Sequence, residues 1–390
     1  MNKNLWLLTA AQGLFMTNNV VFIAINGLVG LALAPAPWMA TLPVMGYVVG
    51  GALSTGPVAR VQQRFGRRRS FMLGLAVAFG SALLAAVAVQ LASFWLLMLA
   101  TVVAGFYSAN GQLYRFAAGE LAAAGAQEKA VSLVLAGGLL GAVAGPALAQ
   151  RARDWTGPPF MGAYLALAVV ALVALAVVAA IRFPDAQRTQ QAGGGRPLGQ
   201  IMRQPDFIVA AAGAALGYGV MNLLMAATPL AMQVCGMPFG DAATVLQWHV
   251  VGMFAPGFFT GHLIKRFGAL PVMGAGVLLN FGCVAIALSG QDLQQFLVAL
   301  LLLGVGWNFL FTGSTTLAMQ SWRPQEKDAA QAAINFFVFA TMALTSFASG
   351  ALVTTQGWAL LNAASLLPLA ITAALLLWLT ALRRRAAART

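Results

Sequence analysis

His249 and a set of methionines are the side chains whose types and spacing indicate chemistry in this sequence of 390 residues. His249 and Met253 are four residues apart, which places both on one face of a helix, about 6 Å apart along its axis. Met221 and Met225 repeat this spacing in the preceding apolar segment. Imidazole and thioether groups are ligands that suit copper, and neither pair has a carboxylate beside it for a harder cation. The alternative is a hydrogen-bonded core histidine among methionines that fill space.

Further sulfur-containing side chains lie between these two pairs, in Met232, Cys235 and Met237. They stand near the outer end of the same segment, so we regard them as candidate ligands for an incoming metal ion, with packing as the alternative. The whole sequence has 2 Cys and 2 His. This count excludes a disulfide framework and a closed Cys/His zinc cage.

The composition places these segments in a membrane. Hydrophobic residues make up 60% of the chain and charged residues 8%, and the mean hydropathy is +0.82. A soluble domain carries about 25% charged residues, so a soluble enzyme fold is excluded. Continuous apolar runs of about 20 residues predict membrane helices, because barrel strands would alternate instead. We place twelve spans at residues 5–34, 38–59, 71–90, 92–114, 129–150, 160–181, 207–234, 241–264, 270–289, 293–318, 329–353 and 357–381.

The basic residues predict how the spans are oriented. Of the 22 Lys and Arg residues, all but Arg151 and Arg153 fall on one side of the predicted membrane. The positive-inside rule places that side, and with it both termini, in the cytoplasm. Topology thus explains the formal net charge of +13, and we expect the chain in the lipid bilayer of a bacterial inner membrane with no nucleic-acid partner.

An internal repeat divides the chain into two halves of six helices. Arg64-Phe65-Gly66 recurs as Arg266-Phe267-Gly268, after the second predicted span of each half. Two halves that share one orientation form the parallel repeat of a transporter fold. We therefore predict an all-α membrane protein with an N-terminal half (1–181), a polar cytoplasmic linker (182–206) and a C-terminal half (207–390).

The loop Arg64-Phe65-Gly66-Arg67-Arg68 resembles the cytoplasmic loop signature of the major facilitator superfamily, and the resemblance extends along the whole chain. It implies alternating access, in which the two halves rock around a central site. It also implies a cytoplasmic gate formed by Arg64, Gly66 and Arg67 and by their counterparts Arg266 and Gly268. The sequence departs from the signature at Gln63, where the superfamily usually has an acidic residue.

Neutral polar side chains lie deep in the predicted spans, whereas all 9 carboxylates fall at loops or helix ends. In the superfamily the first, fourth, seventh and tenth helices line the central cavity. The resemblance therefore implies a cavity lined by Asn18, Asn19, Tyr107, Asn110, Tyr218, Asn222, Asn308 and Thr312. Hydrogen bonding between helices is the alternative role of these groups.

The four-residue spacing of Met221 with Met225 and of His249 with Met253 resembles that of the CcoA-type copper importers of bacteria. This resemblance implies copper uptake into the cytoplasm for cytochrome oxidase maturation, with these four residues as metal ligands. Related members are thought to move organic solutes such as riboflavin, and we expect them to lack the metal motifs.

From these patterns we expect a copper importer, with copper as the transported ion and no cofactor. Two alternatives stay open: a transporter of a neutral organic solute, riboflavin-like or drug-like, and a copper-binding membrane scaffold that does not transport. We expect no enzyme, because neither a phosphate-binding loop ending in Lys-Ser or Lys-Thr nor a His-Glu-x-x-His helix is present. We also expect a monomer that exchanges copper with a carrier protein in the periplasm or the cytoplasm.

Overall fold

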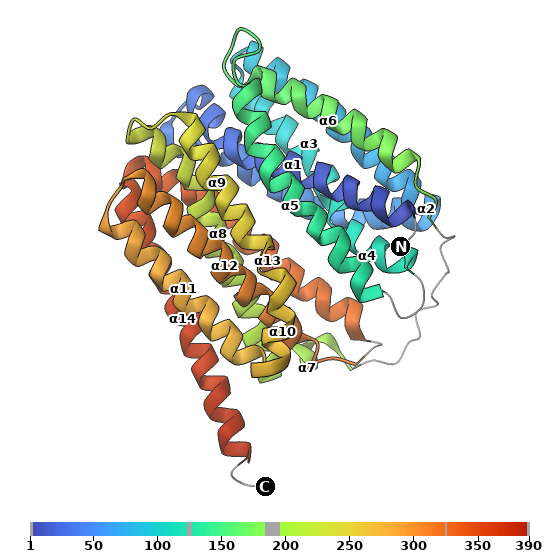
Figure 1. The fold of residues 1–390 in the computed structure, drawn as a ribbon, viewed down its shortest axis with the longest axis vertical. Coiled ribbons are helices and arrows are strands. Elements are labelled where there is room, and N and C mark those ends of the chain that lie inside the picture. The colour runs from blue at the N-terminus through green and yellow to red at the C-terminus, as the bar shows by residue number, and fades with distance from the viewer. Residues whose placement is uncertain (1–2, 123–126, 184–195, 324–325, 388–390) are drawn as a thin grey trace.

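The computed structural model describes residues 3–122, 127–183, 196–323 and 326–387. Within them the chain forms helices, and 11 of these are long and apolar enough to cross a membrane. The chain is thus a multi-pass membrane protein, and the predicted all-α class is confirmed (Figure 1). Residues 184–195, in the middle of the predicted linker, lie outside the described residues.

The helices follow one another in two groups, coloured blue to green and yellow-green to red in Figure 1. The N-terminal group consists of α1 (Lys3–Leu33), the short 3₁₀ helix η1 (Pro37–Met39), α2 (Leu42–Gln90), α3 (Phe94–Gly111), α4 (Tyr114–Leu121), α5 (Gln127–Ala152) and α6 (Met161–Ala179). The C-terminal group consists of α7 (Leu198–Met202), α8 (Pro205–Val234), α9 (Phe239–Phe254), α10 (Gly257–Phe267), α11 (Ala269–Ser289), α12 (Leu293–Ala318), α13 (Lys327–Thr355) and α14 (Gly357–Ala387).

Two glycines interrupt helices at equivalent places in the two halves. Gly66 has φ 80° and ψ 168°, which kinks α2, and Gly268 has φ 90° and ψ 162° between α10 and α11. Backbone of this kind is essentially restricted to glycine. In both halves an arginine also covers the ring of the next residue, with its guanidinium carbon 5.2 Å from the centroid at Arg64 and 5.1 Å at Arg266. The internal repeat is thus a repeat of conformation as well as of sequence.

The predicted span 241–264 is wrong as one continuous helix. It is divided between α9, which ends at Phe254, and α10, which begins at Gly257, with Pro256 between them. Proline has no backbone N–H to donate, and its ring crowds the preceding turn, so the apolar run is broken there. The predicted spans 38–59 and 71–90 correspond to two separate membrane-spanning segments, Pro37–Gln62 and Arg64–Gln90, which the kink at Gly66 separates within α2.

Each half is built on closely packed helices. α2 packs along α3 and α6, and α1 along α5, whereas in the C-terminal half α11 packs along α12 and α8 along α13. Small residues permit this approach, since a Cβ atom added to Gly105 would lie 2.3 Å from the carbonyl carbon of Gly50. Packing through small residues is typical of helices in a bilayer, where apolar burial alone does not drive helices together.

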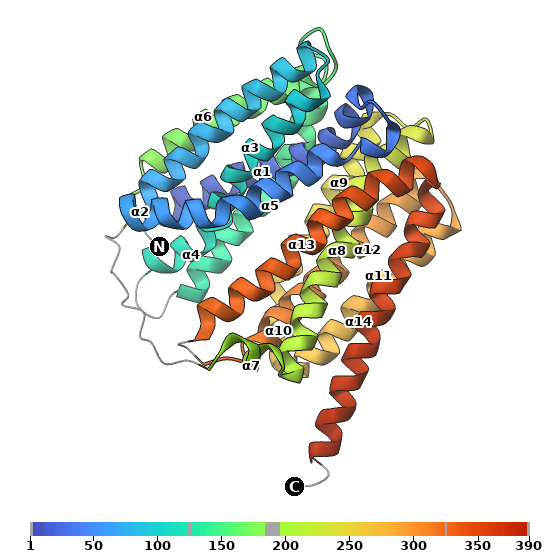
Figure 2. The same cartoon turned by 180° about the vertical axis from the view of Figure 1, so that it is seen from behind.

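The two halves meet at the end of the molecule opposite to the N-terminus, toward the top of Figures 1 and 2. There η1 and α2 contact α13, and α5 contacts α9. Ring contacts join Trp38 with Phe347, at 5.9 Å between centroids, and Phe160 with Phe239, at 5.0 Å. The two halves are therefore closed against one another at the end that we predict to be the outer one.

Candidate functional site

The four predicted metal ligands lie in two helices of the C-terminal half, Met221 and Met225 in α8 and His249 and Met253 in α9. All four side chains are buried. The three methionines belong to one hydrophobic cluster that extends through both halves. Among the described residues no group of three His, Cys, Asp or Glu side chains could hold a metal ion, so a metal here would depend on the thioethers.

His249 is held in a fixed orientation by the neighbouring helix α12. Its Nδ1 lies 2.7 Å from the carbonyl oxygen of Leu300. A carbonyl oxygen only accepts hydrogen bonds, so Nδ1 carries the proton and donates, and Nε2 presents its lone pair. Nε2 is buried and has no hydrogen-bond partner among the described residues. A carbonyl that orients an imidazole in this way is typical of metal-ligating histidines, in which the other nitrogen binds the metal.

Helix α12 contacts both helices that carry the predicted ligands. α9 packs mainly on α12 and α5, and α8 packs mainly on α13, α12 and α14. The direct contact between α8 and α9 is small, although the two helices follow one another in the chain. The physical reason is that α12 offers a packing surface to each of them. Convergence of the four side chains on one ion stays a prediction.

The other sulfur-containing residues have different surroundings. Met232 is fully buried, and Met237 is half-buried against the same core. Cys235 is exposed, and its Sγ donates to Oε1 of Gln291 at 3.1 Å. Cys235 and Met237 stand in the loop at the end where the halves meet. The role of these three residues in receiving an ion stays a prediction.

A group of aromatic rings, which we call the aromatic cluster, joins Tyr218 of α8 to Trp307 and Phe311 of α12. The rings of Trp307 and Phe311 are stacked, with centroids 5.1 Å apart and planes at 9°. Tyr218 meets them edge-on, at 5.3 Å and 5.5 Å. Tyr218 and Phe311 are only partly buried, and Nε1 of Trp307 has no hydrogen-bond partner among the described residues. The cluster thus offers ring faces and a free N–H donor.

Arg115 of α4 is a half-buried cation in the other half of the molecule, with its guanidinium carbon 4.9 Å from the ring centroid of Phe116. Its guanidinium interacts electrostatically with Tyr218. Nε of Arg115 is buried and has no hydrogen-bond partner in the part of the chain that the structure describes. Arg115 directly follows the predicted span 92–114, and its place among the apolar residues of 113–118 was a signal of a role other than topology. A cation beside partly exposed rings can recognise a ligand that has a flat face and polar acceptors.

Three of the predicted cavity-lining amides hold helices together. Asn110 accepts a hydrogen bond from Oγ of Ser70 at 2.8 Å, which joins α3 to α2. Nδ2 of Asn222 lies within 3.1 Å of three acceptors in α13. Nδ2 of Asn308 donates to the carbonyl oxygen of Met253 at 2.7 Å, which joins α12 to α9. These contacts match the interhelical role that the sequence left open as the alternative.

The remaining predicted lining residues have fewer contacts. Asn19 accepts a hydrogen bond of 2.9 Å from the hydroxyl of Tyr47, and Asn18 is buried. Thr312 is half-buried. Tyr107 is buried, and its hydroxyl has no hydrogen-bond partner among the residues described. Tyr107 is thus enclosed in the core of the N-terminal half.

The predicted cytoplasmic gate contains an ion pair that the loop signature did not indicate. Arg67 binds both carboxylate oxygens of Glu120 in α4, with Nε donating to Oε2 at 2.5 Å. Arg68 donates to the carbonyl oxygen of Ala179 at the end of α6. Glu120 thus supplies, from another helix, the acidic partner that the signature usually provides at position 63.

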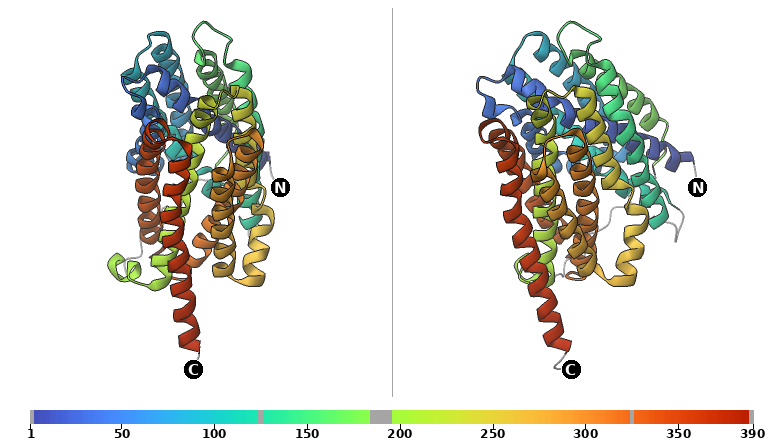
Figure 3. Two further views of the ribbon diagram at one scale, coloured as in Figure 1. Left: turned by 90° about the vertical axis from the view of Figure 1, so that its left-hand side faces the viewer. Right: turned by 60° about the vertical axis from the view of Figure 1, so that its left-hand side comes forward.

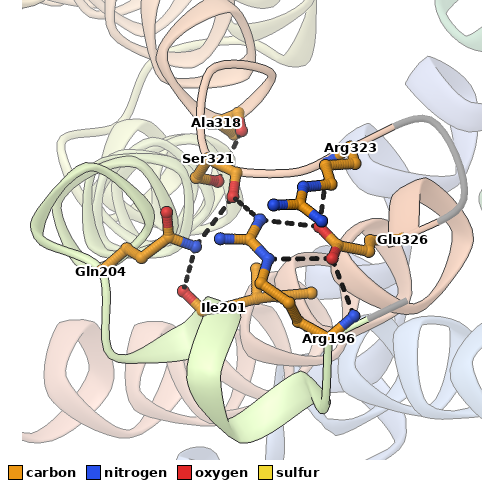
Figure 4. Close-up of polar contacts among 7 residues, drawn as sticks. All are labelled: Arg196, Ile201, Gln204, Ala318, Ser321, Arg323 and Glu326. Atoms are coloured by element: carbon orange, nitrogen blue, oxygen red, sulfur yellow. Dashed lines mark hydrogen bonds and ion pairs between the residues drawn. The ribbon is translucent and has the colours of Figure 1, made fainter. Parts of the chain in front are cut away.

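The last part of the predicted linker is attached to the connection between α12 and α13 (Figure 4). Arg196 donates from Nε and Nη2 to the two carboxylate oxygens of Glu326, at 2.8 Å and 2.7 Å. Nη2 of Arg196 and the side chain of Gln204 both donate to the carbonyl oxygen of Ser321. The Arg196 guanidinium holds the pKa of Glu326 well below its usual range. Only 1% of the Glu326 side chain is exposed, so an acid predicted at a helix end is also buried.

Comparison with known proteins points in one direction. A family model described as Major Facilitator Superfamily matches residues 5–257 and, in a second match, residues 239–390. The riboflavin transporter RfnT of Brucella anthropi is 41% identical over 364 residues, which cover 92% of this chain and 91% of that protein. YdeG of Bacillus subtilis, an uncharacterized transporter of the same type, is 28% identical over 347 residues, covering 85% of this chain and 80% of that protein.

Solved transporter structures share the fold. A bacterial homologue of the human lysosomal transporter Spinster, in an inward-facing and occupied conformation, matches with a TM-score of 0.74 at 16% identity, over 96% of this chain and 95% of that one. The nucleoside transporter NupG matches with a TM-score of 0.74 at 11% identity, over 97% of this chain and 99% of that one. At these identities the likeness shows the fold alone.

Proposed function

The chain belongs to the Major Facilitator Superfamily, and from this membership we propose that it is a secondary transporter of a small, neutral, planar organic solute of the riboflavin type. The observation that carries the proposal is the 41% identity with a riboflavin transporter along 92% of this chain. This identity supports the alternative of an organic solute more than it supports the expectation of copper import.

The aromatic cluster supplies the chemistry that such a solute needs. In this proposal the solute places its ring system against the partly exposed rings of Tyr218 and Phe311, since aromatic rings attract one another in offset and edge-on arrangements. Nε1 of Trp307 and the guanidinium of Arg115 then donate to oxygen and nitrogen atoms at the edge of that ring system. A neutral solute needs no carboxylate partner, which fits the position of all acids at loops or at the ends of the predicted spans.

Uptake into proteoliposomes tests this function. We expect the purified chain to give time-dependent accumulation of riboflavin above that of protein-free vesicles, with competition by excess unlabelled riboflavin. Ribitol, which has the polyol chain of riboflavin and no ring, should not compete, because the proposed contacts are with the ring. Absence of protein-dependent uptake, or equal competition by ribitol, would contradict the proposed solute class.

Copper import is a second candidate function, and the orientation of His249 favours it. Its Nδ1 is fixed on the carbonyl oxygen of Leu300 at 2.7 Å, so Nε2 is left as a buried lone pair in the helix that also carries Met253. Imidazole and thioether ligands together suit Cu(I). In this candidate function Met225 and His249 receive the ion and Met221 and Met253 pass it inward.

Copper and riboflavin uptake by the same vesicles distinguish the two functions. The copper function predicts that His249→Ala abolishes copper accumulation, whereas His262→Ala, which changes the exposed histidine of α10, leaves it intact. The organic-solute function predicts protein-dependent riboflavin uptake and no copper uptake by the unmodified chain. Copper that binds to the protein and does not accumulate inside the vesicles would favour the scaffold alternative.

We further propose that the chain acts as a monomer in a bacterial inner membrane, with both termini in the cytoplasm and no catalytic activity. The distribution of basic residues supports this orientation. Cys235 is exposed at the predicted outer end, whereas Cys283 is buried. We therefore expect a membrane-impermeant maleimide to label Cys235 in cells whose outer membrane is permeabilised, and labelling only after lysis would reverse the proposed orientation.

A further inference from the structure

An apolar groove lies on the outside of the C-terminal half, between α11 and α14. Its volume is about 500 Å³, and its lining includes Leu270, Gly274, Leu376, Leu377, Arg383 and Arg384. The last turns of α14 project beyond the rest of the bundle (Figure 3), and Arg384 lies in the last turn of this helix. The groove thus has an apolar length and a basic end.

The apolar part of the groove is open to the surroundings of the protein. A Cβ atom added to Gly274 would meet no other atom within 4 Å, so this glycine leaves free space in the surface of α11. Leu377 on the facing helix is 71% exposed. Both residues lie in helices that are apolar enough to span a membrane, so the surroundings of the groove are acyl chains of the bilayer.

The two arginines at the basic end differ in their contacts. Arg383 donates to Oδ1 of Asp206 at 2.7 Å and to Oε1 of Gln320 at 3.1 Å. Arg384 is exposed and has no hydrogen bond or ion pair among the described residues. The charge of Arg383 is therefore largely compensated within the protein, whereas that of Arg384 is available to an anion at the end of the groove.

We propose that this groove binds one anionic phospholipid, with an acyl chain along Gly274 and Leu377 and the headgroup phosphate on Arg384. Basic residues at the end of an apolar groove between membrane helices are complementary to a lipid that has an apolar chain and a net negative headgroup. A guanidinium binds phosphate through charge-assisted hydrogen bonds. The groove is separate from the aromatic cluster, so the proposal does not depend on the transported solute.

Native mass spectrometry of the full chain tests the charge requirement. Phosphatidylglycerol and phosphatidylcholine with the same acyl chains are supplied together, and we expect retention of the anionic lipid in preference to the zwitterionic one. Arg384→Gln should lower the retained phosphatidylglycerol about fivefold, the change that corresponds to one basic residue near a membrane surface. Arg385→Gln is the matched control, because it removes the same charge one residue beyond the groove lining. Equal retention of the two lipids, or equal effects of the two substitutions, would overturn the proposal.

A second pair of variants tests the groove itself. Gly274→Phe fills the free space, and we expect it to lower retention of phosphatidylglycerol. Gly80→Phe is the control, because Gly80 is an exposed glycine of α2 where an added Cβ atom also meets nothing within 4 Å. Equal retention by these two variants would overturn the assignment of the acyl chain to the groove. Glycerol 3-phosphate, which has no acyl chain, should not displace the lipid. If Gly274→Phe does not fold, the comparison of Arg384→Gln with Arg385→Gln decides the question.

Discussion

The hydroxyl oxygen of Thr41 accepts a hydrogen bond from the backbone nitrogen of Gly350 at 2.8 Å. The same hydroxyl donates to the carbonyl oxygen of Ser346 at 2.5 Å. Thr41 precedes α2 in one half and Gly350 lies in α13 of the other, so one buried side chain joins the halves at their closed end. A Cβ atom on Gly350 would lie 2.3 Å from this hydroxyl, so the contact requires a glycine there. We call it the outer latch.

Removal of the outer latch is expected to open the outer end. Thr41→Val keeps the side-chain shape and removes both hydrogen bonds, each worth about 0.5–1.5 kcal/mol, which corresponds to a roughly tenfold shift in the equilibrium between the two states. Electron-electron double resonance between spin labels at Cys235 and at Trp155→Cys measures the separation of the halves, since both positions are exposed at this end. We expect a longer distance to become more populated.

The control for the outer latch is Thr55→Val in α2, the helix that Thr41 precedes. The hydroxyl of Thr55 donates to the carbonyl oxygen of Gly51 in its own helix at 3.2 Å, so its loss breaks no contact between the halves. The distance distribution of this variant should match that of the unmodified chain. A Thr41→Val distribution that is also unchanged would show that the latch does not hold the outer end closed.

Trp307 is expected to set the affinity for a planar solute. Trp307→Leu removes the N–H donor proposed for the solute and the ring that holds Phe311 in place for stacking on the solute, and stacking on one aromatic side chain is worth about 1–3 kcal/mol. We expect KM for riboflavin uptake to rise about tenfold or more. Trp378→Leu on α14 is the control, because Trp378 is exposed on the outside of the bundle. Unchanged uptake by Trp307→Leu would remove the aromatic cluster from the solute site.

Gly66 and Gly268 are expected to resist substitution for a backbone reason. Each has a positive φ with ψ near 165°, so Gly66→Ala or Gly268→Ala should cost about 1–3 kcal/mol and lower the melting temperature in detergent. Gly261→Ala in α10 is the control, because an added Cβ atom meets nothing within 4 Å there and its φ is an ordinary one. This substitution should leave stability unchanged or raise it by up to about 1 kcal/mol. An equal fall for all three variants would contradict the conformational explanation.

The fold could be predicted from the sequence largely because apolar length and repeated residues are direct physical signals. Runs of about 20 apolar residues have few stable alternatives to a membrane helix. The Arg-Phe-Gly repeat also marked the two glycines whose backbone conformation proves to be the same. The break at Pro256 escaped prediction, because prolines are tolerated inside other helices of this chain, as Pro229 is in α8.

The candidate site could be predicted less fully, because its contacts join helices that are distant in the sequence. The spacing of His249 and Met253 indicated one helical face, but only the structure shows that His249 is oriented by Leu300 of α12. The roles of Arg115 and Glu120 depend likewise on partners in other helices. A sequence pattern can assign a charged residue to a loop or a helix end, but it does not reveal which side chain of another helix contacts that residue.

The ion pair of Arg196 and Glu326 is expected to stabilise the protein without acting as a pH sensor in the neutral range. A carboxylate whose pKa is lowered on folding contributes stability that is present above its unfolded pKa, about 4.3 for glutamate, and that is lost only as the pH falls toward the lower folded value. Glu326→Gln should therefore lower the melting temperature by the same amount at pH 8 and pH 6. Arg323→Gln is the control, because Arg323 contacts Glu326 through its backbone nitrogen at 2.9 Å and this substitution leaves that bond in place. If the difference in melting temperature between Glu326→Gln and the unmodified chain is smaller at pH 6 than at pH 8, the Glu326 carboxyl titrates in that range. This result would contradict a lowered pKa.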